Sequence, residues 1–503
     1  MFIQRIVFIL VLLYSFGWSL TLSQLQNMPR SVERDFYIWQ YLLQNNTSRS
    51  DAIAAAKLVY RVNSKLDKAL YKKSGLHFKK KRKDTPKKKV AYYRDLINKL
   101  HKKGDFFNAW LQLSDKEKLA VFNLAGTANR KLLNKKLNKE LYQRLTKYHS
   151  INEFLFRINK EHLKNLQNIS LTTPPVRGNR INYNNLLKLG FDSIKRGNDS
   201  LAAQFFKSAI WKASERFYKD KAIFWYYMTS KDGKYLKYLA KSVDFNIYKL
   251  IALDFLGLPY PHPATAPIDM SRKSPIKVDD PIAWARLKQK IFSRKTNLYQ
   301  LAKKYNSKES AAYYYYILNK ASKDTKQYFP LLYRELLSNY SINRQALILA
   351  LARQESRFIP ASVSRSFALG MMQFMPFLIR HIAKKRGEAV SYADIFNPKR
   401  AIRFANDHLN YLNKYLHHPL FVAYAYNAGI GYTRRMLRKN LFRGNGKYEP
   451  YLSLEMVDNE QANHYGKKVL ANYVIYRMLL GSPVRVSTLL KQLDKPELTD
   501  KFR

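Results

Sequence analysis

One glutamate, Glu355, comes at the end of an apolar run that starts at Ala346. The segment 343–356 reads NRQALILALARQES and is hydrophobic on nearly every side until Arg353. A helix that is apolar all round is buried, and burial and the negative end of the helix dipole both penalise an ionised carboxylate. A carboxyl that stays protonated near neutral pH is what a general acid needs. The alternative is an ion pair between Glu355 and Arg353 or Arg357 on an exposed last turn.

Three further motifs follow Glu355. They read SRSFALGMMQFMP at 364–376, AYAYNAGIGY at 423–432 and YGKKVLANYVIYRML at 465–479. Together with ARQES at 352–356, they resemble the motifs of the soluble lytic transglycosylases, which have a lysozyme-like domain that cleaves peptidoglycan. The resemblance is close over about 328–490 and loose over the preceding region, where that family carries a superhelical domain.

The resemblance assigns roles to particular residues. It implies that Glu355 is the catalytic acid and that Tyr465 orients Glu355 or the reacting sugar, although Tyr465 could instead be a packed aromatic residue. Where the family has Glu-Thr-Arg before this tyrosine, the chain has Gln-Ala-Asn at 461–463, which leaves the far wall of the cleft in doubt. The residues expected to bind substrate are Ser364, Gln373, Met375, Tyr426, Asn427, Glu455 and Tyr465, and those expected to support the site structurally are Ser356, Gly370 and Gly429.

The residue types fit these roles. Gly370 lets the backbone approach a sugar closely, and Gln373 offers both an amide donor and a carbonyl acceptor for an N-acetyl group. Met375 suits an adaptable apolar wall, although core filling is the alternative for at least one methionine of this motif. Gly429 follows an apolar run and is typical of a helix C-cap.

A single well-placed acid decides which reaction is expected. Most glycosidases use two carboxyl groups, but Asp394, Asp407 and Glu449 fall outside the motifs. The resemblance implies a mechanism without a second carboxylate, in which the C6 hydroxyl of N-acetylmuramic acid closes on C1 to leave a 1,6-anhydro end. The rival interpretations are a muramidase that uses water and a non-catalytic scaffold of a cell-wall complex.

The composition excludes other classes of site. The chain has no cysteine, so it has neither disulfides nor a lipidation cysteine. The histidines are scattered, with no His-Glu-x-x-His motif, and glycine loops for phosphate are absent. We therefore expect no metal and no cofactor.

The elements that position the motifs are predicted to be helices. Glycine and proline are scarce, at 17 and 18 of 503 residues, and aromatic residues recur at spacings of three and four. The predicted fold is mainly α: an irregular α-solenoid or superhelix, a small helical linker domain and a lysozyme-like α domain with little β structure. The corresponding segments are 1–19 (signal peptide), 20–258, 259–327 and 328–495.

Residues 1–19 and the charge suggest where the protein acts. Arg5 precedes an apolar run at 6–16 and small residues at 17–19, which is typical of a signal peptide and predicts export to the periplasm. The formal net charge is +54, which favours a polyanion. Export argues against nucleic acid as the partner. The resemblance implies that the partner is peptidoglycan glycan strands, with at most peripheral membrane contact. The sequence makes no prediction about protein partners.

Overall fold

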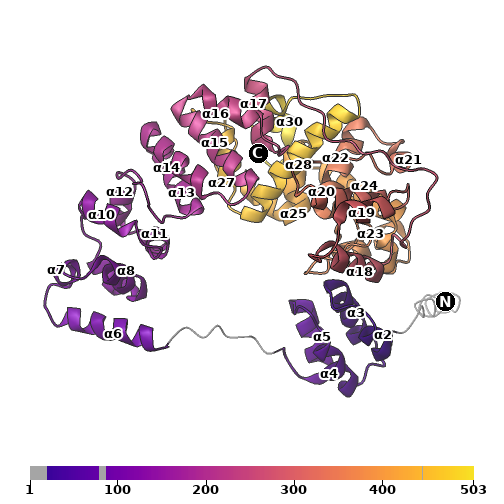
Figure 1. Cartoon of the computed structure of the whole chain (residues 1–503), viewed down its shortest axis with the longest axis horizontal. Helices are drawn as coiled ribbons and strands as arrows, with labels where there is room; N and C mark the ends of the chain where they lie inside the picture. Colours follow the sequence, from indigo (N-terminus) through magenta and orange to yellow (C-terminus); the bar gives the residue numbers. More distant parts are fainter. Residues whose placement is uncertain (1–19, 79–86, 445) are drawn as a thin grey trace, which may run out of the picture. The chain divides into compact units, whose positions relative to one another are not determined.

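The computed structural model describes residues 20–78, 87–444 and 446–503, and helices form the regular structure of this part of the chain (Figure 1). The β structure within it consists of isolated bridges, including Val363 with Leu369 and Leu369 with Phe374. The predicted mainly α fold is therefore confirmed. The signal peptide predicted at 1–19 lies outside the described residues.

Contacts divide the chain into two compact units. The first joins Met1–Lys80 to Tyr260–Arg503, and the second is Lys81–Pro259. The proline-rich stretch 259–281 begins where the second unit ends and contains no helix before α18 (Pro281–Ile291). The predicted domain borders at 258, 327 and 495 stay predictions.

The second unit is a succession of helices in which neighbours along the chain pack together. Helix α13 packs on α14, α14 on α15, α15 on α16 and α16 on α17, as expected for a solenoid. A Cβ atom on Gly190 would lie 2.5 Å from Cε1 of Phe206, so glycine allows α13 and α14 to approach closely. The helices of this unit are α6 (Lys87–His101), α7 (Phe106–Leu111), α8 (Asp115–Leu124), α9 (Thr127–Leu132), α10 (Lys139–Leu145), α11 (Ile151–Lys160), α12 (Lys164–Ser170), α13 (Tyr183–Lys195), α14 (Asp199–Lys212), α15 (Arg216–Ser230), α16 (Gly233–Ala240) and α17 (Ile247–Phe255).

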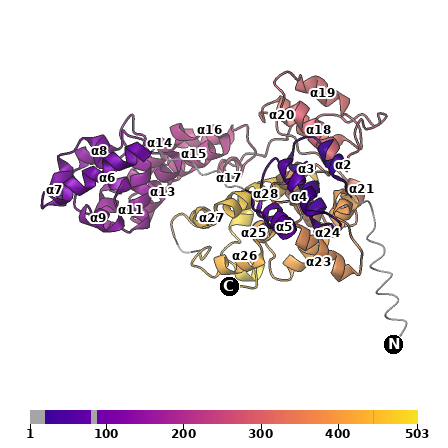
Figure 2. The ribbon, with the colours of Figure 1, turned by 90° about the horizontal axis from the view of Figure 1, so that it is seen from below.

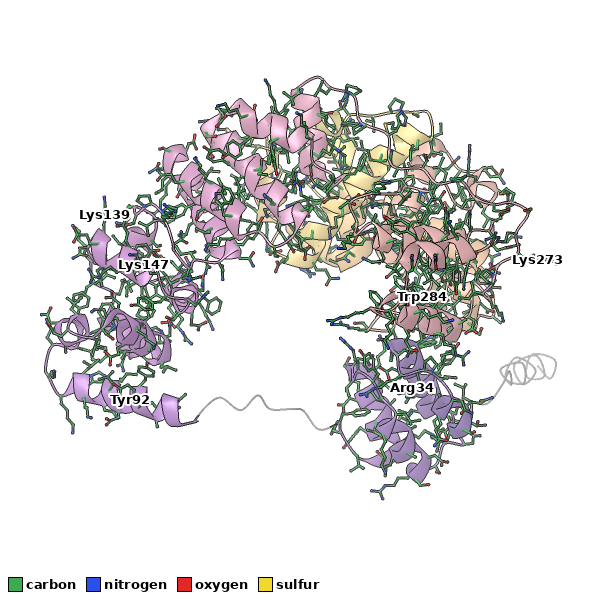
Figure 3. All side chains as sticks on the ribbon, in the orientation of Figure 1. Arg34, Tyr92, Lys139, Lys147, Lys273 and Trp284 are labelled. Atoms are coloured by element: carbon green, nitrogen blue, oxygen red, sulfur yellow. The ribbon has the colours of Figure 1, made fainter. Side chains whose placement is uncertain are left out.

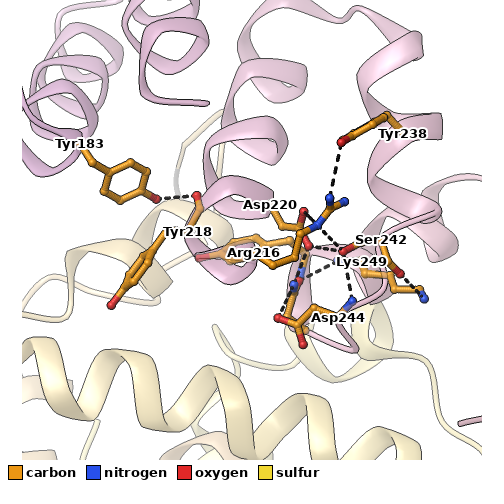
Figure 4. A network of polar contacts seen from close by, with 10 residues as sticks. Tyr183, Arg216, Tyr218, Asp220, Tyr238, Ser242, Asp244 and Lys249 are labelled. Carbon is orange, nitrogen blue, oxygen red and sulfur yellow. Dashed lines mark hydrogen bonds and ion pairs between the residues drawn. The ribbon is translucent and has the colours of Figure 1, made fainter. Parts of the chain in front are cut away.

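A polar network ties the last helices of the second unit together (Figure 4). Asp220 is fully buried and accepts hydrogen bonds from Asn246, at 2.8 Å, and from Ser242. It also forms an ion pair with Arg216 at 2.9 Å. Lys249 donates to the carbonyl of Ser242 at 2.6 Å. Because a buried carboxylate needs such partners, this network fixes how α15 and α17 pack.

The N-terminal helices of the first unit begin at polar caps. Ser31 accepts a hydrogen bond from the amide of Arg34 at the start of α3, as its place before the helix predicts. Helix α3 packs on α18, and Lys288 forms an ion pair there with the buried Glu33 at 2.5 Å. Figure 3 labels Arg34 on α3 and Trp284 on α18. The helices of this part are α2 (Leu22–Gln26), α3 (Val32–Leu43), α4 (Arg49–Lys57), α5 (Ser64–Ser74), α18 (Pro281–Ile291), α19 (Leu298–Lys304) and α20 (Ala311–Ala321).

The C-terminal part of the first unit is built around one long helix. Helix α28 packs against both α22 (Figure 1) and α25 (Figures 1 and 2), so the predicted motifs from three distant stretches of sequence lie on neighbouring helices. The helices are α21 (Arg334–Leu337), α22 (Ile342–Ser356), α23 (Pro376–Arg386), η1 (Ala393–Phe396), α24 (Pro398–Asn413), α25 (Pro419–Ala428), α26 (Ile430–Leu437), α27 (Tyr451–Met456), α28 (Glu460–Leu479), α29 (Val486–Leu490) and α30 (Pro496–Thr499).

Candidate active site

Glu355 lies in the last turn of α22, and its carboxyl group meets a tyrosine from α28. The hydroxyl of Tyr465 donates a hydrogen bond of 2.7 Å to Oε1 of Glu355. The residues before Glu355 from Ala346 to Arg353 are buried, which confirms the all-round burial that the apolar run predicts. The site therefore has an acid at a helix end with one defined hydrogen-bond donor.

The alternative ion pair of Glu355 is absent from the described residues. Arg353 donates to Oδ1 of Asn472 at 2.7 Å and lies 3.6 Å from the centroid of the Phe329 ring. Arg357 makes a long contact of 3.9 Å with Asp324. Both cations thus have other partners, and the acid keeps its hydrogen bond from tyrosine.

Burial controls the protonation of the site. Burial of the Glu355 carboxyl raises its pKa to about 7, and the hydrogen bond from Tyr465 opposes this rise. Burial, with the nearby charge of Glu355, also raises the pKa of Tyr426 and Tyr465 well above that of an ordinary tyrosine. The two tyrosines therefore stay neutral donors, while the glutamate is poised to exchange a proton near neutral pH.

A loop at 362–374 is fastened to these helices. Ser356 donates to the carbonyl of Met371 at 2.8 Å, and Tyr426 on α25 donates to the carbonyl of Met372 at 2.9 Å. Gly370 has a φ of +76°, and a Cβ atom there would lie 2.6 Å from the carbonyl oxygen of Ile395. In the structure, the backbone of Gly370 closely approaches the backbone of Ile395; its predicted approach to a sugar stays a prediction.

The remaining predicted residues occupy the same loop and the end of α25. Gln373 donates to the carbonyl of Gly370 at 2.8 Å, which leaves its carbonyl oxygen as an acceptor. Ser364 accepts from the amide of Ala368 at 2.9 Å. Met375 and Asn427 are half-buried, and Met375 directly precedes α23. Gly429 has a φ of +87° and caps α25, as its place after the apolar run predicts.

Glu455 lies apart from the residues above. Its side chain is 1% exposed and forms an ion pair with Lys467, whose side chain is equally buried. This ion pair satisfies the carboxylate within the packing between α27 and α28. Substrate binding by Glu455 stays a prediction.

Residues far away in the sequence hold the loop from its other side. The buried ring of Phe367 lies 5.8 Å from that of Phe36 and 5.6 Å from that of Trp39, both on α3. Asn63 and Lys65 donate to the backbone carbonyls of Arg365 and Ser366 at 2.8 and 2.7 Å. The sequence offered no signal for these contacts, because the partners are about 300 residues apart.

A metal cluster and a membrane-spanning helix are both absent from the described part of the chain. No group of three or more His, Asp or Glu side chains in 20–78, 87–444 or 446–503 is placed to hold a metal ion. Among the same residues, no helix combines the length and the apolar character needed to cross a membrane.

The comparisons with known proteins concern the part of the chain that carries this geometry. The family described as the transglycosylase SLT domain matches residues 333–448. The soluble lytic murein transglycosylase of Escherichia coli is 30% identical over 159 residues, an alignment that covers 30% of this chain and 24% of that protein. The membrane-bound lytic murein transglycosylase C of Pectobacterium atrosepticum is 34% identical over 139 residues, covering 25% of this chain and 38% of that protein.

The solved 70-kDa soluble lytic transglycosylase of Escherichia coli aligns with a TM-score of 0.43 and 17% identity, over 94% of this chain and 84% of that chain. The chain spans about a quarter of the length of the soluble curated relatives it matches. The match at 333–448 includes Glu355, the loop with Gly370 and Gln373, and the end of α25. Residues 333–448 therefore match the family of the transglycosylase SLT domain, in a chain whose last third is similar to the soluble lytic murein transglycosylases.

Proposed function

We propose that this protein is a peptidoglycan lytic transglycosylase that cleaves the β-1,4 bond between N-acetylmuramic acid and N-acetylglucosamine without water, in turnover of the cell wall. One observation carries the proposal: Glu355, inside the SLT domain, is a half-buried acid whose pKa is raised to about 7 by burial of its carboxyl group, with a tyrosine donor at 2.7 Å. Such a group can give up and take back a proton within one reaction cycle.

The reaction has two proton transfers and both use Glu355. The protonated carboxyl gives its proton to the glycosidic oxygen, and the bond between that oxygen and C1 of N-acetylmuramic acid breaks. The electron-poor C1 is stabilised by the oxygen of the 2-acetamido group. The Glu355 carboxylate then removes the proton from the C6 hydroxyl, whose oxygen bonds to C1 and forms the 1,6-anhydro ring.

The electrostatics of Glu355 support a mechanism with one carboxylate. A retaining glycosidase places two carboxyl groups about 5 Å apart, and a second negative charge at that distance would raise the pKa of the first. Among the described residues, the influences on the pKa of Glu355 are burial and the hydrogen bond from Tyr465, with no acidic neighbour. The substrate's own C6 hydroxyl then serves as the nucleophile.

The other residues around Glu355 are proposed to bind the glycan. Gln373 keeps a free acceptor, and Asn427 is half-buried with no hydrogen bond within the described residues. Both amides suit the N-acetyl groups of the sugars. Ser364, Met375 and Tyr426 are proposed to line the flanking subsites, while Tyr465 orients Glu355, and Ser356, Gly370 and Gly429 keep the loop and α25 in place.

We also propose a place of action. The pattern of residues 1–19 suits export to the periplasm. The net charge of +54 suits a polymer whose peptides carry carboxylates. Figure 3 labels Lys139, Lys147 and Lys273, which are exposed. If the positive charge contributes to binding, the affinity for purified sacculi should fall steeply with added salt. Binding that does not respond to salt would contradict this part of the proposal.

Digestion of purified sacculi by the wild type and Glu355→Gln tests the function. We expect products from the wild type whose masses lack one water, as 1,6-anhydro ends require, and none from Glu355→Gln. Glu335→Gln is the matched control, because Glu335 lies on α21 with a side chain 78% exposed. Products that retain the water would identify a muramidase, and a wild type that cleaves nothing would favour a scaffold.

A further inference from the structure

A second feature of the chain has the chemistry of a sugar-binding site and lies in the second unit. Trp211, near the end of α14, is 80% exposed. It lines a pocket of about 460 Å³, formed between α14 and the turn at 175–179. Pockets that hold small ligands typically measure about 300–1,000 Å³.

The face of α14 that lines this pocket is polar around the indole. Gln204, Ser208 and Trp211 recur at spacings of four and three residues, so they share one side of the helix. The opposite side carries the buried residues Phe205, Phe206, Ala209 and Ile210. The exposed tryptophan is thus separate from the hydrophobic core that joins the helices.

The turn that forms the other wall is held in place by a buried amide. Asn179 is 4% exposed and donates to the carbonyl of Val176 at 2.8 Å and to the hydroxyl of Ser208 at 3.3 Å. Lys212 donates to the carbonyl of Asn179 at 2.8 Å. These bonds fix the turn against α14, so the pocket exists before any ligand binds.

The charged side chains that line the pocket are all basic. The described residues that line it include Arg177, Lys207 and Lys212 and no carboxylate. Lys207 lies 5.6 Å from the ring centroid of Tyr226 and Lys212 is bonded to the turn, whereas Arg177 is exposed and makes no hydrogen bond within the described residues. A free guanidinium binds carboxylates through paired hydrogen bonds.

We propose that this pocket is a second binding site for an anionic glycan, outside the SLT domain. The indole face would receive the C–H face of a pyranose ring, because the negative π face attracts the positive C–H edges. Gln204 and Ser208 would bond to hydroxyl or acetamido groups, and Arg177 to a carboxylate on the same strand. The identity of the glycan as peptidoglycan rests on the proposed function.

An anionic membrane is the other polyanion that tryptophan and basic residues can contact. Interfacial helices present several large apolar side chains on one face. Here a single indole lies in a hollow whose other walls are amides, a hydroxyl and cations. The geometry therefore favours a ligand with both an apolar ring face and polar groups at its edge.

Binding to sacculi by the full chain in the Glu355→Gln background tests this site without cleavage. We expect Trp211→Ala and Arg177→Ala each to weaken binding roughly tenfold, the loss typical of a tryptophan or arginine at the centre of a binding site. Phe156→Ala is the matched control, since Phe156 on α11 is 55% exposed beside Lys160 at 5.8 Å and does not line the pocket. We expect its binding to be unchanged.

The outcomes separate this inference from the proposed function. If the wild type releases anhydro products but Trp211→Ala and Arg177→Ala bind sacculi like the parent, the second site is wrong and the function stands. Binding to vesicles of anionic lipid that depends on Trp211 would likewise overturn the glycan assignment. If the wild type cleaves nothing while both variants lose binding, the site stands and the function fails. Thermal unfolding of each variant at the parent's temperature shows that the fold is intact.

Discussion

The hydroxyl of Tyr465 on α28 donates a 2.7 Å hydrogen bond to Oε1 of Glu355 on α22, and this bond joins the last motif of the chain to the first. It acts against burial, because burial raises the pKa of Glu355 to about 7 while the hydrogen bond lowers it. Tyr465 therefore sets both the direction of the carboxyl group and the pH at which it loses its proton.

The pH dependence of cleavage follows from this pKa. A general acid works in its protonated form, so kcat/KM should fall as the pH rises through about 7. Rates of release of soluble products from sacculi, measured at constant ionic strength between pH 5 and 9, check this. A rate that stays constant to pH 9 would exclude Glu355 as the acid.

Replacing the tyrosine should move that pH limit. Tyr465→Phe removes the hydrogen bond that lowers the pKa, so the fall in kcat/KM should shift to higher pH, and kcat should drop about 10- to 100-fold as the carboxyl group loses its orientation. Tyr476→Phe is the control, because Tyr476 is a fully buried tyrosine of the same helix whose hydroxyl makes only a 3.4 Å bond to Pro330. An unshifted profile in Tyr465→Phe would refute the role of the bond.

Ionisation of Glu355 should lower the free energy of unfolding of the protein. Since the pKa of Glu355 is raised in the folded state, the folded state binds this proton more strongly than the unfolded chain. That stabilisation is complete below the ordinary pKa of glutamate and is lost as the pH rises through about 7. Glu355→Gln cannot ionise, so relative to the wild type it should gain about 1–3 kcal/mol between pH 5 and pH 8.

Unfolding of the two proteins by urea at pH 5 and pH 8 measures this difference. The same experiment on Glu335→Gln provides the control, because the exposed Glu335 has no burial to relieve. An equal effect of Glu355→Gln at both pH values would show that the carboxyl group is not buried in solution.

The sequence was informative wherever local patterns determine structure. The apolar run 346–352 correctly predicted a buried helix that ends beside Glu355, and Gly429 after the next apolar run correctly predicted the C-cap of α25. Patterns of this kind depend on neighbours within one or two helical turns. The helix ends and the burial of the acid were therefore accessible from sequence.

Long-range partners were not accessible. The packing of Phe36 and Trp39 against Phe367 joins segments that share no repeat or motif, so one sequence gives no sign of it. The ion pair of Glu455 with Lys467 was not accessible for a related reason: a carboxylate near a motif looks available for ligands until its buried partner is known.

The Glu455–Lys467 pair should behave as a structural element. Glu455→Gln leaves a buried cation without its charge partner and should destabilise the first unit by about 3–5 kcal/mol. Adding Lys467→Met removes that unpaired charge, so the double variant should be more stable than Glu455→Gln alone. Urea unfolding of the variants forms a double-mutant cycle. A fully stable Glu455→Gln with a raised KM for glycan would instead support substrate binding by Glu455.

Gly370 should tolerate no side chain, because two separate constraints act on it. Its φ of +76° disfavours any L-residue, and a Cβ atom would lie 2.6 Å from the carbonyl oxygen of Ile395, a backbone atom that cannot rotate away. Gly387 isolates the first constraint, since its φ is +65° but nothing lies within 4 Å of its Cβ position. Gly387→Ala should therefore cost about 1 kcal/mol, and Gly370→Ala about 2–4 kcal/mol, with loss of cleavage as the loop that carries Gln373 shifts. Equal costs for the two variants in urea unfolding would show that the contact with Ile395 relaxes freely and that the loop is not fixed by it.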